Sequence, residues 1–231
     1  MQSNSFSNFI GGISNQPLLV LNPVFKATDY VPLNLSVTNT DLQNINVSAS
    51  AQLEAYIVKY IKKHKAAVAY GGYNETRAIY KRSNYFNASN ETERNIHLGI
   101  DLWCEANTAV FTPLDATVHS FKNNTNFGDY GPTIILKHVV NTVCFYTLYG
   151  HLSANSIINL RVGQSFKQGE QIATLGDASV NGDYPPHLHF QIIKDVGNYF
   201  GDYPGVCNKK DLDFYLENCP DPNLLLRLVS Y

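Results

Sequence analysis

The chain has little charge and no long hydrophobic run. Charged residues make up 16% of its 231 residues and the net charge is −2. The basic patch that nucleic acids or a membrane surface would require is therefore missing, and we expect neither partner. No apolar run approaches the ~18 residues of a membrane span. No Lys or Arg precedes Lys26, so the basic start of a signal peptide is lacking and we expect a cytoplasmic protein.

The chain also lacks a cysteine pattern. Its four cysteines share no C-x-x-C spacing, and a chain this long does not need a disulfide framework. We therefore expect free, buried thiols.

The clearest helical pattern lies in residues 50–65. Leu53, Ile57 and Ile61 recur at helical spacing, and Ser48 or Ser50 stands where a helix cap is expected. The apolar stripe is too large to leave in water, so we expect this helix to pack against the rest of the protein. Residues 1–70 are thus predicted to be an N-terminal extension, irregular up to residue 47 and then helical.

From residue 71 onward the pattern is that of β-structure. Short alternating or apolar runs, such as GPTIILKHVV and HLHFQII, are separated by Asn- and Gly-containing turns. Residues 71–231 are therefore predicted to be a mainly β domain with an antiparallel sheet.

Three of these predicted strands carry polar residues suited to chemistry. His187 and His189 lie two positions apart and share a strand face, as do His97 and Asp101 in IHLGIDLW. His151 lies at the end of a third strand. A catalytic zinc ion takes three nitrogen or oxygen ligands and keeps one position open. Two of these histidines and Asp101 would fill that set and leave two histidines free.

The motifs His-x-Gly-x-Asp, Tyr-x-His-Leu and His-x-His-Phe, in this order, resemble those of the lysostaphin-like (LytM-type) zinc metalloendopeptidases. The similarity covers about residues 94–195. A longer similarity is to peptidase-like modules found fused to aminotransferase and kinase-like domains. The resemblance implies a half-barrel core of the duplicated hybrid motif type and one Zn²⁺ per chain. It implies His97, Asp101 and His189 as metal ligands, and His151 and His187 as catalytic residues.

By the same resemblance, the substrate is a glycine-containing or peptidoglycan-type peptide, and the expected cytoplasmic location favours a soluble wall fragment or a small peptide. Loop 177–186 departs from the family pattern and is more acidic, with Asp177 and Asp183. We expect it to rim the groove and to alter substrate preference. Latent relatives cover their metal with a preceding segment, so residues 1–47 are a candidate cover here.

Other functions stay open at this stage. One is a catalytically silent binding or activator module of the same fold, although such proteins typically lose metal ligands and all five positions are present here. Another is a zinc hydrolase of a small amide metabolite. A third alternative is a β domain whose histidines have no catalytic or binding role, but all five positions would then match the family motifs by coincidence. His119 and His138 lie in apolar strand contexts and are predicted to be structural.

Overall fold

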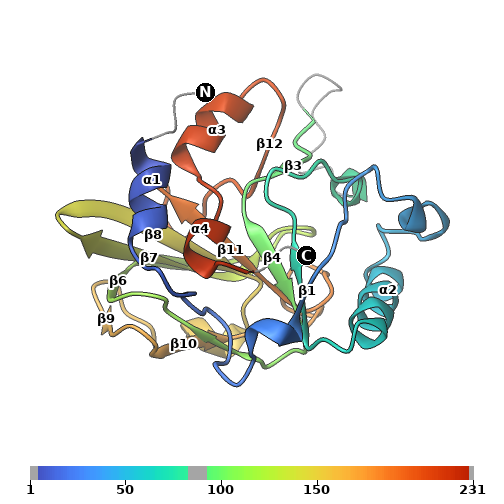
Figure 1. Cartoon of the computed structure of the whole chain (residues 1–231), viewed down its shortest axis with the longest axis horizontal. Coiled ribbons are helices and arrows are strands. Elements are labelled where there is room, and N and C mark those ends of the chain that lie inside the picture. Colours follow the sequence, from blue (N-terminus) through green and yellow to red (C-terminus); the bar gives the residue numbers. More distant parts are fainter. Residues whose placement is uncertain (1–4, 83–92, 229–231) are drawn as a thin grey trace.

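The computed structural model describes residues 5–82 and 93–228, which fold around one large β-sheet (Figure 1). The sheet has the strand order β1-β2-β4-β11-β8-β7-β6-β9, and its neighbours are antiparallel except for the parallel pair β1–β2. Two small ladders, β5–β10 and β3–β12, flank it. The predicted mainly β fold is confirmed.

The predicted runs become strands because their residues alternate between two buried faces. The strands are β1 (Tyr30–Pro32), β2 (Val68–Gly71), β3 (Ile96–His97), β4 (Ile100–Trp103), β5 (Ala109–Phe111), β6 (Ala116–Asn124), β7 (Gly131–Val140), β8 (Val143–Gly150), β9 (Ser165–Phe166), β10 (Gln171–Thr174), β11 (His187–Ile193) and β12 (Val206–Cys207). The helices are α1 (Ser5–Gly12), α2 (Ser50–Lys63), α3 (Leu212–Asn218) and α4 (Asn223–Leu226), with short 3-10 turns η1 (Ala27–Asp29), η2 (Thr40–Asn44), η3 (Ile79–Arg82) and η4 (Ala154–Ile157).

The two faces of the sheet have different partners. On one face, Leu102, Phe190 and Tyr149 belong to the main core, which α1 and α4 cover. On the other face, two smaller apolar clusters lie apart from each other, one around Trp103 and one around Leu148. The side chains of His187, His189 and Gln191 project from β11 on this second face, because they pair with Trp103, Asp101 and Leu148 in register. The candidate site therefore lies between the two smaller clusters.

Helix α2 packs against the β-structure, as predicted. Its Leu53 and Ile57 are buried in a cluster with Trp103 and Tyr184, and Figure 1 shows the helix on the side of the molecule opposite α1. The expected serine cap is wrong, since Ala49 occupies the N-cap position. Ser50 instead donates its hydroxyl to Asp183 at 2.7 Å, which ties α2 to the loop before β11.

The N-terminal residues are joined to the sheet. Strand β2 spans the predicted boundary at residue 70, and it pairs with β1 on one side and with β4 on the other. The division of the chain at residue 70 stays a prediction. Within residues 5–82 and 93–228, no helix is long and apolar enough to cross a membrane.

The four cysteines are free, as predicted. Cys104, Cys207 and Cys219 are buried, but Cys144 of β8 is exposed, so the expectation of burial is wrong for that thiol.

His138 of β7 is a buried residue of the sheet, which fits its predicted structural role. Its Nδ1 donates to the backbone oxygen of Asp115 at 3.0 Å, and its Nε2 lies 2.7 Å from the Thr147 hydroxyl. Burial lowers the pKa of His138 from 6.5 to about 4. The ring is therefore neutral in the folded protein at neutral pH.

We predict that His138 contributes to acid sensitivity. Its pKa is lower in the folded than in the unfolded state, so the unfolded state binds more protons between pH 6.5 and pH 4. The stabilisation is complete above pH 6.5 and declines as pH falls towards 4, by about 2–3 kcal/mol. Urea unfolding at pH 7 and pH 4.5 should show a larger loss of unfolding free energy for wild type than for His138→Gln. Equal losses in both proteins would contradict the prediction.

Candidate metal centre

Three adjacent strands of the large sheet deliver most of the site. His189 of β11 lies directly opposite Asp101 of β4 on one side and Gly150 of β8 on the other. His187, two residues earlier on β11, pairs with Trp103. The period-two alternation of β11 therefore places both imidazoles on one face, as the sequence predicts.

His97 also reaches the site, but it does not lie on the same strand as Asp101, contrary to the prediction from the sequence. The stretch 96–103 is not one strand, because β3 ends at His97 and β4 begins at Ile100. Strand β3 pairs with β12 in a separate ladder. His97 still points towards Asp101 and His189, since its Nδ1 is held at 2.9 Å by the backbone oxygen of Gly72.

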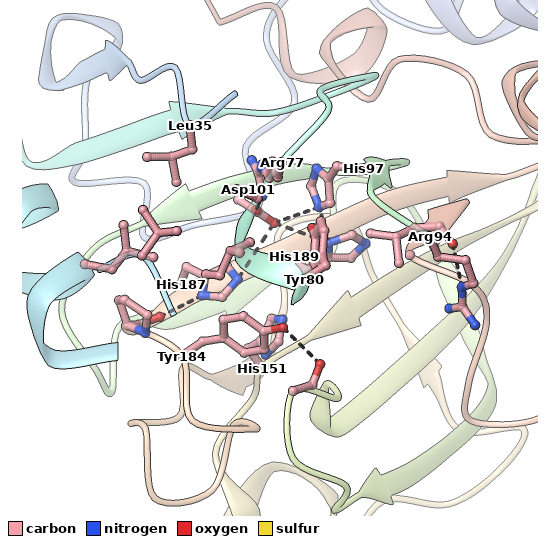
Figure 2. Close-up of a pocket in the computed structure, with 18 of the residues that line it drawn as sticks. Leu35, Arg77, Tyr80, Arg94, His97, Asp101, His151, Tyr184, His187 and His189 are labelled. Carbon is pink, nitrogen blue, oxygen red and sulfur yellow. Dashed lines mark hydrogen bonds and ion pairs between the residues drawn. The ribbon is translucent and has the colours of Figure 1, made fainter. Parts of the chain in front are cut away.

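Three side-chain atoms converge on one point in this site (Figure 2). His97 Nε2 lies 2.8 Å from His189 Nδ1 and 3.3 Å from Asp101 Oδ1, and His189 Nδ1 lies 3.2 Å from Asp101 Oδ1. All three side chains are buried. Tetrahedral ligands with bonds of about 2.0–2.1 Å would be about 3.3 Å apart, so the spacing suits a small ion such as zinc.

The hydrogen bonds on the far side of each ring decide which nitrogen faces this point. His97 Nδ1 must donate to the carbonyl of Gly72, which leaves a lone pair on Nε2. His189 Nε2 lies 2.9 Å from Gln191 Oε1, and the Gln191 amide nitrogen donates to the Pro204 carbonyl at 3.2 Å, so His189 Nε2 carries the proton. Two lone pairs and a carboxylate oxygen then face each other, and a cation is what such a set binds.

The two carboxylate oxygens of Asp101 have different surroundings. Its Oδ2 accepts from Arg77 Nη1 at 2.5 Å, whereas its buried Oδ1 has no hydrogen-bond partner. An unpaired buried carboxylate oxygen is costly unless an ion or a donor satisfies it. Burial raises the pKa of Asp101, but His97 and Arg77 outweigh burial and hold that pKa well below its ordinary value. The residues present therefore fit a metal ion bound through Oδ1.

Gly99, the central residue of His-x-Gly-x-Asp, allows His189 to approach. A Cβ on Gly99 would lie 2.6 Å from His189 Cε1 and 2.8 Å from the Phe190 carbonyl oxygen. The backbone at Phe190 cannot move without a large cost in free energy. An added methyl group would therefore push the His189 ring away from its present position.

We predict that Gly99→Ala weakens metal binding by about 10–100-fold, the effect typical of disturbing a ligand's orientation. A zinc competition titration measures it. Gly12→Ala is the matched control, because a Cβ there meets nothing within 4 Å. Wild-type zinc affinity in Gly99→Ala would show that the close approach does not matter.

His151 enters the site through an unusual backbone conformation. Gly150 faces the same way as His189, so regular alternation would turn His151 towards the main core. Instead His151 has φ +62°, in the left-handed region that non-glycine residues rarely adopt. The ring is turned back onto the site, with its centroid 4.1 Å from that of His187. Such strain is typical of functional positions.

His151 and His187 are held as neutral bases. Their Nδ1 atoms contact the backbone oxygens of Asn181 at 2.8 Å and Pro185 at 2.7 Å, so their Nε2 lone pairs face the cavity. Burial lowers the pKa of both rings below the ordinary histidine value, and for His151 the neighbouring imidazoles lower it further. His187 Nε2 lies 3.8 Å from Asp101 Oδ1 and so borders the candidate metal ligands.

Several residues of the site were not identified from the sequence. Arg77 and Gln191 hold the ligands Asp101 and His189, and Trp103 stacks on His187 with ring centroids 5.9 Å apart. Tyr130 lies beside the site, with its hydroxyl 3.4 Å from His189 Nε2. The alternation of the strand places Gln191 on the same face as His187 and His189, but it does not indicate that Gln191 holds His189. Nothing in the sequence indicated Arg77, because its partner is 24 residues away.

The five residues lie at the floor of a cavity of about 420 Å³. Loop 177–186 contributes Tyr184 and Pro185, both buried, to the lining of the cavity, and its expected place at the rim of the groove stays a prediction. Its acidic residues are engaged elsewhere, Asp183 with Ser50 and Asp177 with Ser179. Residues 35–47 line a side wall of this cavity, and the idea that the N-terminal segment blocks the metal stays untested.

Residues 95–200, which contain all five site residues, match the model of peptidase family M23. We call this segment the M23 domain, after the family model that it matches. An uncharacterized metalloprotease of Haemophilus influenzae is 32% identical to the chain over 95 residues, which are 41% of the chain and 18% of that relative. The chain thus spans about a fifth of the length of this curated relative.

Solved structures similar to the M23 domain include the catalytic domain of lysostaphin from Staphylococcus simulans. It is 23% identical, with 52% of this chain and 80% of that chain covered and a TM-score of 0.35. A zinc-containing peptidase from Vibrio cholerae is 28% identical, with 47% of this chain and 31% of that chain covered and a TM-score of 0.35.

Proposed function

We propose that this protein is a zinc-dependent metalloendopeptidase. The observation that carries the proposal is the convergence of His97 Nε2, Asp101 Oδ1 and His189 Nδ1 within the M23 domain. Each of these atoms bears a lone pair, and the far side of each ligand is fixed by a second partner. Nitrogen and oxygen ligands in threes are typical of catalytic zinc sites.

Zinc at this position would polarise the scissile carbonyl and lower the pKa of a bound water molecule. His187 is the proposed general base, because its Nε2 lone pair lies nearest to the ligand atoms. His151 is the proposed stabiliser of the carbonyl oxygen. Its Nε2 bears a lone pair, so for this role it must take up a proton from solvent, and the negative charge that develops on the substrate favours that protonation. The proton that His187 removes from water would pass to the leaving amine.

The proposed substrate is a peptide of the glycine-containing or peptidoglycan type, the class implied by the family resemblance. The cavity volume of about 420 Å³ lies in the range of ligand pockets, which supports a small substrate such as a short peptide. A soluble wall fragment fits the cytoplasmic location that we expect, and this location stays a prediction.

A metal-removal experiment tests the proposed function. The protein is stripped with a chelator and assayed against a library of short peptides, then reconstituted with one equivalent of Zn²⁺ and assayed again. We expect hydrolysis only after reconstitution, with products that identify an internal peptide bond. Tight zinc binding without hydrolysis of any peptide or amide would favour a silent binding module. Hydrolysis of small amides alone would favour the metabolite hydrolase.

A further inference from the structure

The candidate site continues into an apolar wall that lies outside the M23 domain. The wall consists of Leu35, Val37, Leu42, Val47 and Leu53, which line the same cavity as the five site residues. These residues come from the segment between β1 and α2 and from the first turn of α2. The M23 match begins at residue 95, so the wall lies outside the residues that match the family model.

The wall is connected to His187 through Trp103. Leu35 and Leu53 belong to a buried cluster with Trp103. The Trp103 ring in turn stacks on His187, the proposed base. A group resting on this wall would therefore lie next to the reacting bond.

Hydrogen bonds fix the wall to a metal ligand. The backbone nitrogen of Leu35 donates to Glu75 Oε1 at 3.0 Å, and Arg77 bridges the other Glu75 oxygen to Asp101. The wall and the metal centre are thus parts of one connected structure, which favours a permanent subsite of defined shape.

Charged residues also line the cavity. Arg94, Asp129 and Asp202 are among them, and in Figure 2 Arg94 and Leu35 appear on opposite sides of the cluster. Arg77 lies closer to the wall, but its charge is paired with Glu75 and Asp101. A charged side chain would lose hydration against the five apolar residues of the wall. A large apolar side chain would gain by burial.

We propose that this wall is a specificity subsite for a bulky aliphatic or aromatic side chain beside the cleaved bond. The proposal rests on the proposed peptidase function and narrows its substrate class. Peptides with only glycine around the bond would leave the subsite empty. Filling it should raise kcat/KM by about 10–100-fold.

Binding can be tested without catalysis, because Trp103 is the single tryptophan of the chain and lies in the subsite. Zinc-free protein is titrated with paired peptides that carry Leu or Gly at one position on either side of the expected bond. We expect the Leu peptide to change the tryptophan fluorescence and to bind at least tenfold more tightly. Equal affinities at both positions would overturn the proposal.

Turnover with the zinc-loaded protein gives the second test. Val47→Phe should fill the subsite and lower the Leu-over-Gly ratio of kcat/KM at least fivefold. Val58→Phe is the matched control, since Val58 is 41% exposed on α2 and does not line the cavity, and its ratio should stay at the wild-type value. An unchanged ratio in Val47→Phe, or a wild-type preference for Gly, would overturn the subsite.

The two hypotheses fail in different ways. Hydrolysis with a preference for Gly contradicts the proposed subsite but supports the peptidase function. Tight binding of the Leu peptide at Trp103 without hydrolysis of any peptide supports the subsite and contradicts the peptidase function.

Discussion

His189→Ala is expected to lose zinc and peptidase activity together. His189 supplies one of three converging ligand atoms, and its neighbours on β4 and β8 offer no replacement, since Asp101 already serves and Gly150 has no side chain. His187→Ala should instead keep zinc, because His97, Asp101 and His189 stay in place. Its turnover should fall by roughly 10²–10⁴-fold, the usual cost of a lost general base.

Elemental analysis for zinc beside a peptide hydrolysis assay distinguishes the two variants. His64→Ala is the control, because His64 is an exposed residue at the end of α2 and should keep both zinc and activity. Zinc loss in His187→Ala with retention in His189→Ala would show that the two roles are reversed. Full zinc and activity in both variants would refute the proposed site.

Arg77→Met is expected to be among the most destabilising single substitutions. The Arg77 guanidinium is buried between Glu75 and Asp101, and it lies 5.4 Å from the centroid of the Trp103 ring. Removing it leaves the buried Asp101 carboxylate without its cation, a loss of about 3–5 kcal/mol of unfolding free energy. Part of this loss should return when zinc binds, because the ion then supplies positive charge to Asp101.

Urea unfolding of wild type and Arg77→Met, each with and without zinc, measures both effects. The double variant Glu75→Gln/Arg77→Met is the control, since it removes one of the two acidic charges along with the cation. It should be more stable than Arg77→Met alone. Wild-type stability of the zinc-free Arg77→Met protein would contradict the importance of this ion pair.

The sequence by itself determined several strands of the sheet that carries the site. The runs at 131–140 and 187–193 become β7 and β11 because their alternation and flanking turn residues are local signals. Alternation also determined that His187 and His189 share a face. Strand pairing, which alternation does not specify, then placed Asp101 opposite His189.

The tertiary structure alone decided the rest of the site. His151 faces His187 because its backbone adopts φ +62°, which no periodic pattern predicts. The strand predicted across 96–103 is interrupted between β3 and β4, and the contact of His97 with Gly72 directs its ring towards Asp101 and His189. Arg77 and the apolar wall come from segments whose contacts with the M23 domain are long-range. Such contacts depend on packing between distant parts of the chain, and local sequence carries no record of them.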